Sequence, residues 1–400
     1  MDFAYTRQEN DTSLLNRLDA IRDGRDLEVL EPFAKAYLGL FYDIDSNVPA
    51  VDRIDLLANP ELSAAIKQGF VSLLRQADLP TPEMIATSLL QKEIMATGYI
   101  VLAGMSMQQA LSPHSISDLP EACLKSAICF HHAISTFHDD SWYEPVLTAR
   151  PQLAAEALLA MWQVLLDNKQ YFLPGLHSVL EKESMLPLFR HCAIALLKTW
   201  RHCRHRDLSR LLSLAIHHVE AETLHNTARA ALSECTDMSQ RNQVYWHATL
   251  FLLAPDEHGQ DMINFMGQEK IKLLPLLDFV IPLLDSPSAG SFSLSATGYA
   301  YLIRCLAQKF TPQIDMHDNL GEITLKVLWL FYQLAGFSNE QAKQALSGLQ
   351  RVRVLKLYSD IFTAVAAYQT SDDLPDFELF VQRLRDEGRL RMKKNWHDVK

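Results

Sequence analysis

The sequence predicts an all-α protein, and three observations lead to that prediction. Gly and Pro, which interrupt helices, number only 14 and 17 in 400 residues, and they cluster at helix-length intervals. Apolar residues recur at the three- and four-residue spacing of one helical face. The apolar–polar alternation of strands is rare. We therefore expect an irregular α-solenoid of stacked antiparallel helix pairs.

The helices can be placed in chain order from their apolar faces and their start signals. The first two faces comprise Leu30, Phe33, Ala34, Tyr37, Leu38 and Phe41, and then Leu62, Ile66, Phe70, Leu73 and Leu74. Thr81 before Pro82 predicts a capped helix start, and Ser338 with Gln341 has capping-box spacing. Breaks are expected at Pro151, Pro187 and Pro312. Strands could compete only at 291–296 and 351–354, which are too short to build a sheet alone.

These helix starts and breaks divide the chain into four regions. We predict an N-terminal helical region over 1–115, a central repeat-like region over 116–285, a C-terminal helical region over 286–381 and a basic charged tail over 382–400. No Gly/Ser-rich linker separates them.

Composition limits the class of protein. A hydrophobic fraction of 48% supports a large core, and a net charge of −11 disfavours a surface built wholly for nucleic-acid phosphates. Six cysteines without a C-x-x-C pair, no signal-peptide pattern and no apolar run of about 18 residues predict a cytoplasmic chain with reduced thiols and no membrane span.

Signatures of common catalytic sites are missing. The glycine positions exclude G-x-x-x-x-G-K-[ST], G-x-G-x-x-G and G-x-S-x-G, and no His precedes a Glu as H-E-x-x-H requires. We therefore expect no enzymatic activity, no cofactor and no ATP hydrolysis by this chain alone.

Several short sequence segments along the chain resemble segments of a known protein family. They are 36–39 (AYLG), 77–81 (ADLPT), 149–154 (ARPQLA) with Trp162, Trp246 with 251–255 (FLLAP), and 302–307 (LIRCLA). Together, over roughly residues 14–370, they resemble the helical region that follows the ATPase in bacterial NACHT-type STAND NTPases. The resemblance implies an α-solenoid that recognises a trigger, often a phage component, in antiviral defence.

The chain departs from that family because it carries no NTPase motif, so no nucleotide-binding residue transfers to it. The resemblance then implies either a sensor-like piece whose ATPase is a separate subunit, or a free-standing relative that only binds. We expect a protein partner, either a phage protein or that separate NTPase subunit.

Histidines provide the main hint of chemistry. His218, Glu222 and His225 follow at steps of four and three, which would place two imidazoles and a carboxylate on one helical face, and His202 and His205 could face them. These ligand types suit Zn or Fe. We interpret them as a polar helix face and expect no bound metal. A metal-dependent enzyme using this cluster is the alternative.

A second group joins His131 and His132 with His138, Asp139 and Asp140. It is rich in possible acid–base or metal-binding residues. We interpret it as one core histidine followed by acidic residues at a helix end, where Asp140 could cap the next segment.

Surface binding residues can also be proposed. Arg385, Arg389 and Lys393 share one helical face of the tail and could contact nucleic acid or an acidic partner, but we interpret the tail as a solvated terminal helix. Trp142 and Tyr143 are candidate anchors for a partner. The function favoured by the sequence is a non-catalytic scaffold that binds a protein.

Overall fold

The computed structural model describes residues 3–307, apart from 42, 46, 117, 135–140, 171, 200–204, 235–237, 268 and 286–293, and then 326–327, 329–330 and 333. Every regular element in these residues is a helix, which confirms the all-α class. None of the described helices is both long and apolar enough to cross a membrane. Two compact units are present, an N-terminal unit (Met1–Trp200) and a C-terminal unit (Arg201–Lys400).

The N-terminal unit contains twelve α-helices among its described residues, and short 3₁₀ turns join some of them. Their bounds are α1 (Phe3–Leu14), α2 (Leu18–Arg22), α3 (Leu27–Tyr37), α4 (Ala50–Leu57), α5 (Pro60–Leu73), α6 (Pro82–Leu90), α7 (Ala96–Leu111), α8 (Glu121–Ala133), α9 (Tyr143–Ala149), α10 (Pro151–Asp167), α11 (Leu176–Glu181) and α12 (Leu186–Thr199).

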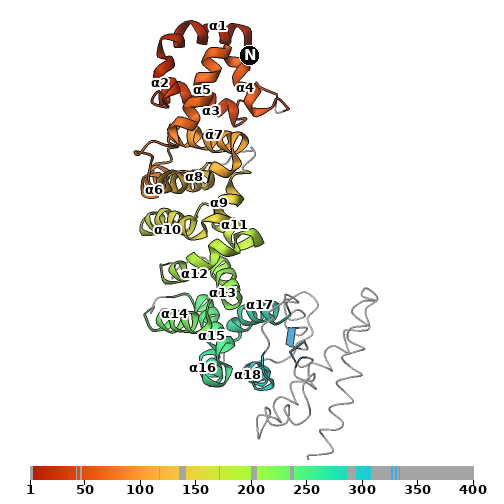
Figure 1. Cartoon of the computed structure of the whole chain (residues 1–400). Coiled ribbons are helices and arrows are strands. Elements are labelled where there is room, and N and C mark those ends of the chain that lie inside the picture. The colour runs from red at the N-terminus through yellow and green to blue at the C-terminus, as the bar shows by residue number, and fades with distance from the viewer. Residues whose placement is uncertain are drawn as a thin grey trace, which may run out of the picture. The chain divides into compact units, whose positions relative to one another are not determined.

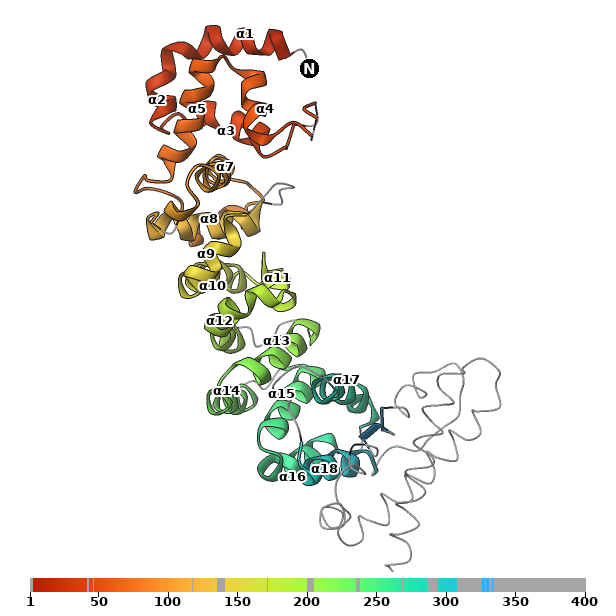
Figure 2. The ribbon, with the colours of Figure 1, turned by 45° about the vertical axis from the view of Figure 1, so that its right-hand side comes forward.

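These helices stack in layers that follow the order of the chain. The helices α1 and α2 pack on α4 and α5, α3 and α5 pack on α7, and α7 packs on α8. The helices α6 and α8 then contact α10, which packs on α12 (Figures 1 and 2). Each layer thus buries its apolar face against its neighbours along the chain, as expected for stacked helix pairs.

Two glycines allow these layers to approach closely. A Cβ on Gly69 of α5 would lie 2.1 Å from the Ile21 carbonyl oxygen of α2, and a Cβ on Gly104 of α7 would lie 2.5 Å from the Phe70 carbonyl oxygen of α5. A side chain at either position would require the backbone to move. The α2–α5 and α5–α7 contacts therefore depend on glycine.

Local start signals behave largely as predicted. The Thr81 hydroxyl accepts a hydrogen bond from the Met84 backbone N–H, and Pro82 opens α6. Pro151 likewise opens α10. The first predicted face extends too far, because α3 ends at Tyr37 and Phe41 lies beyond it. The predictions at Pro312, Ser338–Gln341 and 351–354 lie outside the described residues.

The C-terminal unit is organised differently. Its described helices are α13 (His205–His218), α14 (Ala221–Glu234), α15 (Gln240–Leu253), α16 (Pro255–Met266), α17 (Leu273–Leu284) and α18 (Ala296–Ala307). The helices α13, α14, α16 and α17 all pack on α15, and α18 packs on α16. Residues from Val244 to Leu252 of α15 are nearly all buried, so α15 is the core of this unit.

The described cysteines fit the prediction of reduced thiols. Cys123, Cys129, Cys192 and Cys305 are buried, and none of them forms a disulfide. Burial raises the pKa of the Cys123 and Cys192 thiols to about 12. These groups therefore stay protonated near neutral pH and act as small apolar core side chains.

Candidate functional site

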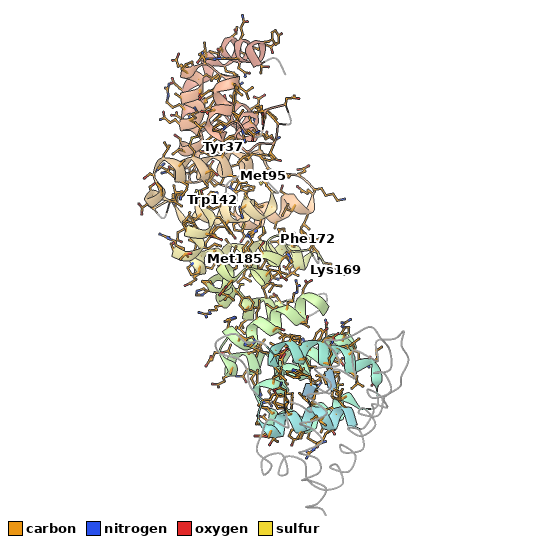
Figure 3. The ribbon with its side chains drawn as sticks, turned by 90° about the vertical axis from the view of Figure 1, so that its right-hand side faces the viewer. Tyr37, Met95, Trp142, Lys169, Phe172 and Met185 are labelled. Carbon is orange, nitrogen blue, oxygen red and sulfur yellow. The ribbon has the colours of Figure 1, made fainter. Side chains whose placement is uncertain are left out.

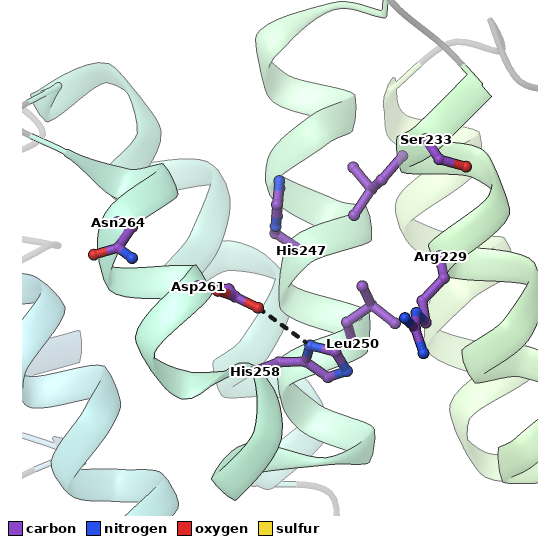
Figure 4. Close-up of a pocket in the computed structure, with 8 residues that line it drawn as sticks. Arg229, Ser233, His247, Leu250, His258, Asp261 and Asn264 are labelled. Carbon is purple, nitrogen blue, oxygen red and sulfur yellow. Dashed lines mark ion pairs between the residues drawn. The ribbon is translucent and has the colours of Figure 1, made fainter.

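The described part of the C-terminal unit contains a pocket of about 490 Å³ between α14, α15 and α16 (Figure 4). Its lining residues are Arg229, Leu232 and Ser233 from α14, His247 and Leu250 from α15, and His258, Asp261 and Asn264 from α16. Two imidazoles, a guanidinium and a carboxylate thus meet beside the core helix.

His258 is the most highly connected of these residues. Its side chain is buried, and its Nε2 atom lies 2.8 Å from Nε2 of His225 on α14. Glu257 Oε1 lies 3.5 Å from the same nitrogen, and Asp261 Oδ2 lies 3.7 Å from Nδ1 on the opposite side of the ring (Figure 4). His258 is therefore held between an imidazole and two carboxylates.

The start of α16 explains this arrangement. Pro255 opens the helix, so Glu257 and His258 fall in its first turn and Asp261 lies one turn further along. The carboxylate of Glu257 is favoured there by the positive end of the helix dipole. A spacing of three residues places His258 and Asp261 on one face. The start of α16 thus brings the side chains of His258 and Asp261 to the pocket.

His247 forms the second ionisable position. Its ring stacks on Phe265, with ring centroids 3.9 Å apart, and the Nζ atom of Lys272 lies over the same Phe265 ring, 4.1 Å from its centroid. Burial lowers the pKa of His247 to about 4; Asp261 opposes this shift, whereas Lys272 and His258 add to it. His247 is therefore a neutral imidazole near neutral pH.

Nucleophilic chemistry finds little support in this pocket. The Ser233 hydroxyl donates to the Ala230 carbonyl at 3.0 Å, the ordinary arrangement of a serine within a helix. Among the described residues, no Ser, Thr or Cys side chain is hydrogen-bonded to His247 or His258. The pocket is better suited to binding an ion or a polar group than to activating a nucleophile.

The cluster predicted from sequence spacing is not assembled. The helix α13 ends at His218 and α14 begins at Ala221, so His218 does not share a continuous helical face with Glu222 and His225, which both lie in α14. The predicted face is therefore wrong at His218, and His225 joins a different group. His202 lies outside the described residues, as does the side chain of His205.

The second predicted histidine group divides between core and undescribed residues. His132 contacts the Tyr143 hydroxyl, and burial lowers the pKa of His132 to about 3. His131 stacks on Tyr143, with ring centroids 4.0 Å apart. His138, Asp139 and Asp140 lie outside the described residues. His132 is half-buried against Tyr143, so it meets the expectation of a core histidine only in part.

Of the predicted partner-binding residues, two are buried and three lie outside the described residues. The side chains of Trp142 and Tyr143 are only 1% and 3% exposed, because they pack against His131 and His132 inside the N-terminal unit. Burial rather than contact with a partner explains these two aromatics. Arg385, Arg389 and Lys393 lie outside the described residues.

An exposed aromatic that the sequence did not single out is Phe172, in the loop between α10 and α11 of the N-terminal unit. Its side chain is 79% exposed, and Figure 3 shows it beside Lys169 at one edge of the unit. Phe172 is the most exposed of the large hydrophobic side chains that the structure describes. Sequence reasoning had no signal for it, because exposure depends on the loop's path.

Both ends of this loop are fixed. At the end of α10, Lys169 adopts a left-handed conformation (φ 59°), and the Gln170 N–H donates to the Leu165 carbonyl at 2.9 Å, which closes the helix. At the far end, the buried Trp162 indole N–H donates to the Pro174 carbonyl at 2.8 Å. Phe172 therefore lies between two anchored positions, Gln170 and Pro174.

Gly175 completes the far anchor. It has a φ of 81°, and a Cβ at this position would lie 2.5 Å from the ring of His132. The histidine paired with Tyr143 thus also forms the surface on which the loop ends.

No protein-family model, curated protein or solved structure matches the chain.

Proposed function

We propose that the chain is a non-catalytic helical scaffold that binds a protein partner through the Phe172 loop (residues 168–175) of the N-terminal unit. The observation that supports this proposal most directly is that Phe172 is 79% exposed on a loop whose two ends are hydrogen-bonded to the rest of the unit. Such a loop loses little conformational freedom on binding, and an aromatic anchor that fills a partner's pocket supplies much of the affinity. A matching partner offers an apolar pocket.

The proposed setting is the cytoplasm. The described cysteines are buried and form no disulfide, and burial keeps the Cys123 thiol protonated, which supports a reducing compartment. The resemblance to the helical region of NACHT-type STAND NTPases further supports a sensor-like role in bacterial antiphage defence. The partner would then be a phage protein or an NTPase subunit supplied separately.

The test compares two exposed-residue variants of the full chain as affinity baits. Phe172→Ala removes the anchor, and Ile271→Ala removes a side chain of similar exposure (73%) from the C-terminal unit. We expect one protein to be enriched by the wild type and by Ile271→Ala but lost with Phe172→Ala. Equal recovery by Phe172→Ala, or recovery of the bait alone, would contradict the proposal.

The defence role has a separate readout. Cells lacking the gene should become more susceptible to phage, and complementation with Phe172→Ala should fail where Ile271→Ala succeeds. Unchanged susceptibility on deletion would remove the defence role while leaving partner binding to be judged by the capture experiment.

A further inference from the structure

We propose that His225, Glu257 and His258 bind a divalent first-row transition metal ion, for which Zn²⁺ is the probe. The three side chains bring one ligand atom each to within 4.8 Å of one another, from α14 and from the first turn of α16. Two imidazoles and a carboxylate form a common protein ligand set for Zn²⁺. This site is independent of the proposed partner-binding loop and extends beyond it.

The distances fit a small rearrangement onto an ion. Zn²⁺ binds nitrogen at about 2.0–2.1 Å, so neighbouring tetrahedral ligand atoms lie roughly 3.3 Å apart. The two Nε2 atoms are 2.8 Å apart, and Glu257 Oε1 is 3.5 Å from His258 Nε2. The ion would take the place of the proton between the two imidazoles, and a water molecule or a partner group would complete the fourth position.

Asp261 acts as the orienting residue. Its Oδ2 atom faces Nδ1 of His258 at 3.7 Å, which favours a proton on Nδ1 and leaves Nε2 free to bind the ion. A carboxylate behind a ligating histidine is the usual support for such a site. His258 is also buried, so its ring has little freedom to turn away.

The local charge favours a cation. Glu257 and Asp261 contribute two negative charges, and Arg229, which lines the same pocket, contributes one positive charge. The group therefore carries a net charge of about −1 while both imidazoles are neutral, and a dication is attracted to it. Because the ligands come from α14 and α16, which flank α15, the ion would cross-link two helices of the C-terminal unit.

The experiment titrates Zn²⁺ into the metal-free full chain by calorimetry, and uses the visible spectrum of bound Co²⁺ to report the geometry. His225→Ala and Glu257→Gln change partly exposed or exposed ligands, so the fold should be retained. His218→Ala is the matched control, because it removes the neighbouring histidine that sequence spacing predicted and the structure places on another helix.

We expect one Zn²⁺ per chain, with affinity lowered about tenfold or more by His225→Ala and by Glu257→Gln, and unchanged in His218→Ala. Bound Co²⁺ should show the intense visible absorption of a four-coordinate site. The absence of stoichiometric binding, or equal affinity in wild type and both ligand variants, would overturn the proposal.

Discussion

The two units solve the same packing problem in different ways. In the N-terminal unit, helices from α1 to α12 are buried layer against layer in chain order, whereas in the C-terminal unit four helices surround α15. A layered stack confines most contacts to neighbouring layers. A unit built around one helix makes its surrounding helices depend on that helix. Damage should therefore remain local in the first unit and spread through the second.

The largest expected effect comes from truncating the core of α15. Trp246 is fully buried, and Trp246→Ala should lower the free energy of unfolding of the C-terminal unit by about 3–5 kcal/mol. Hydrogen exchange should show protection lost together in α13–α17. Trp162→Ala, the comparison in α10, should lose protection mainly in α6 and α8–α12.

Trp246→Phe sharpens that test. The Trp246 indole N–H is buried without a hydrogen-bond partner among the described residues, so phenylalanine removes an unsatisfied donor while keeping most of the apolar volume. We expect a much smaller loss than for alanine. A loss as large as that of Trp246→Ala, or one confined to α15, would break the contrast between the units.

A smaller effect is expected at the closest contact between layers. Gly69→Ala should destabilise the N-terminal unit by about 1–3 kcal/mol, because the new methyl group would meet the Ile21 carbonyl. Gly298→Ala in α18 is the control, since its Cβ would meet the flexible Leu294 side chain instead. Chemical denaturation measures both. A neutral Gly69→Ala would show that α2 and α5 are free to separate.

Acid should act on the C-terminal unit through His247. Its pKa is about 4 in the folded chain against an ordinary value of 6.5, so the unfolded chain binds more protons between these values. Stability is therefore full above about pH 6.5 and declines as the pH falls toward 4. His247→Gln should flatten this decline in thermal melts of the unit. An unchanged slope would contradict a neutral buried imidazole.

The smallest effect concerns a surface ion pair between α4 and α5. Lys67 Nζ lies 2.8 Å from Asp55 Oδ1, and Asp55→Asn should cost at most about 1 kcal/mol. High salt should reduce the difference between wild type and variant, because partly exposed charges are screened. A salt-independent difference would indicate that the Ser63 contact with Asp55 carries the effect.

Much of the N-terminal unit could be predicted from the sequence, because its signals are local. Thr81 and Pro82 mark a helix start through contacts within one turn, and Pro151 does the same for α10. The apolar face around Phe70 is likewise a property of one helix. Local steric and capping rules decide such features without knowledge of the tertiary fold.

The candidate sites depended on contacts that spacing cannot reveal. No Pro or Gly marks the break between His218 and Ala221, so the predicted face extended through a helix boundary. His225 and His258 are 33 residues apart and meet only because α14 and α16 both pack on α15. The exposure of Phe172 similarly depends on anchors at Trp162 and Gly175.

The proposed role of the Phe172 loop in partner binding can be tested in a single quantitative capture. Full-length wild type, Phe172→Ala and Glu257→Gln are compared as baits, with the recovered partner measured by mass spectrometry. We expect Phe172→Ala to lose the partner and Glu257→Gln to retain it at the wild-type level. Full retention of the partner by Phe172→Ala would contradict the claim that this chain binds through its anchored loop.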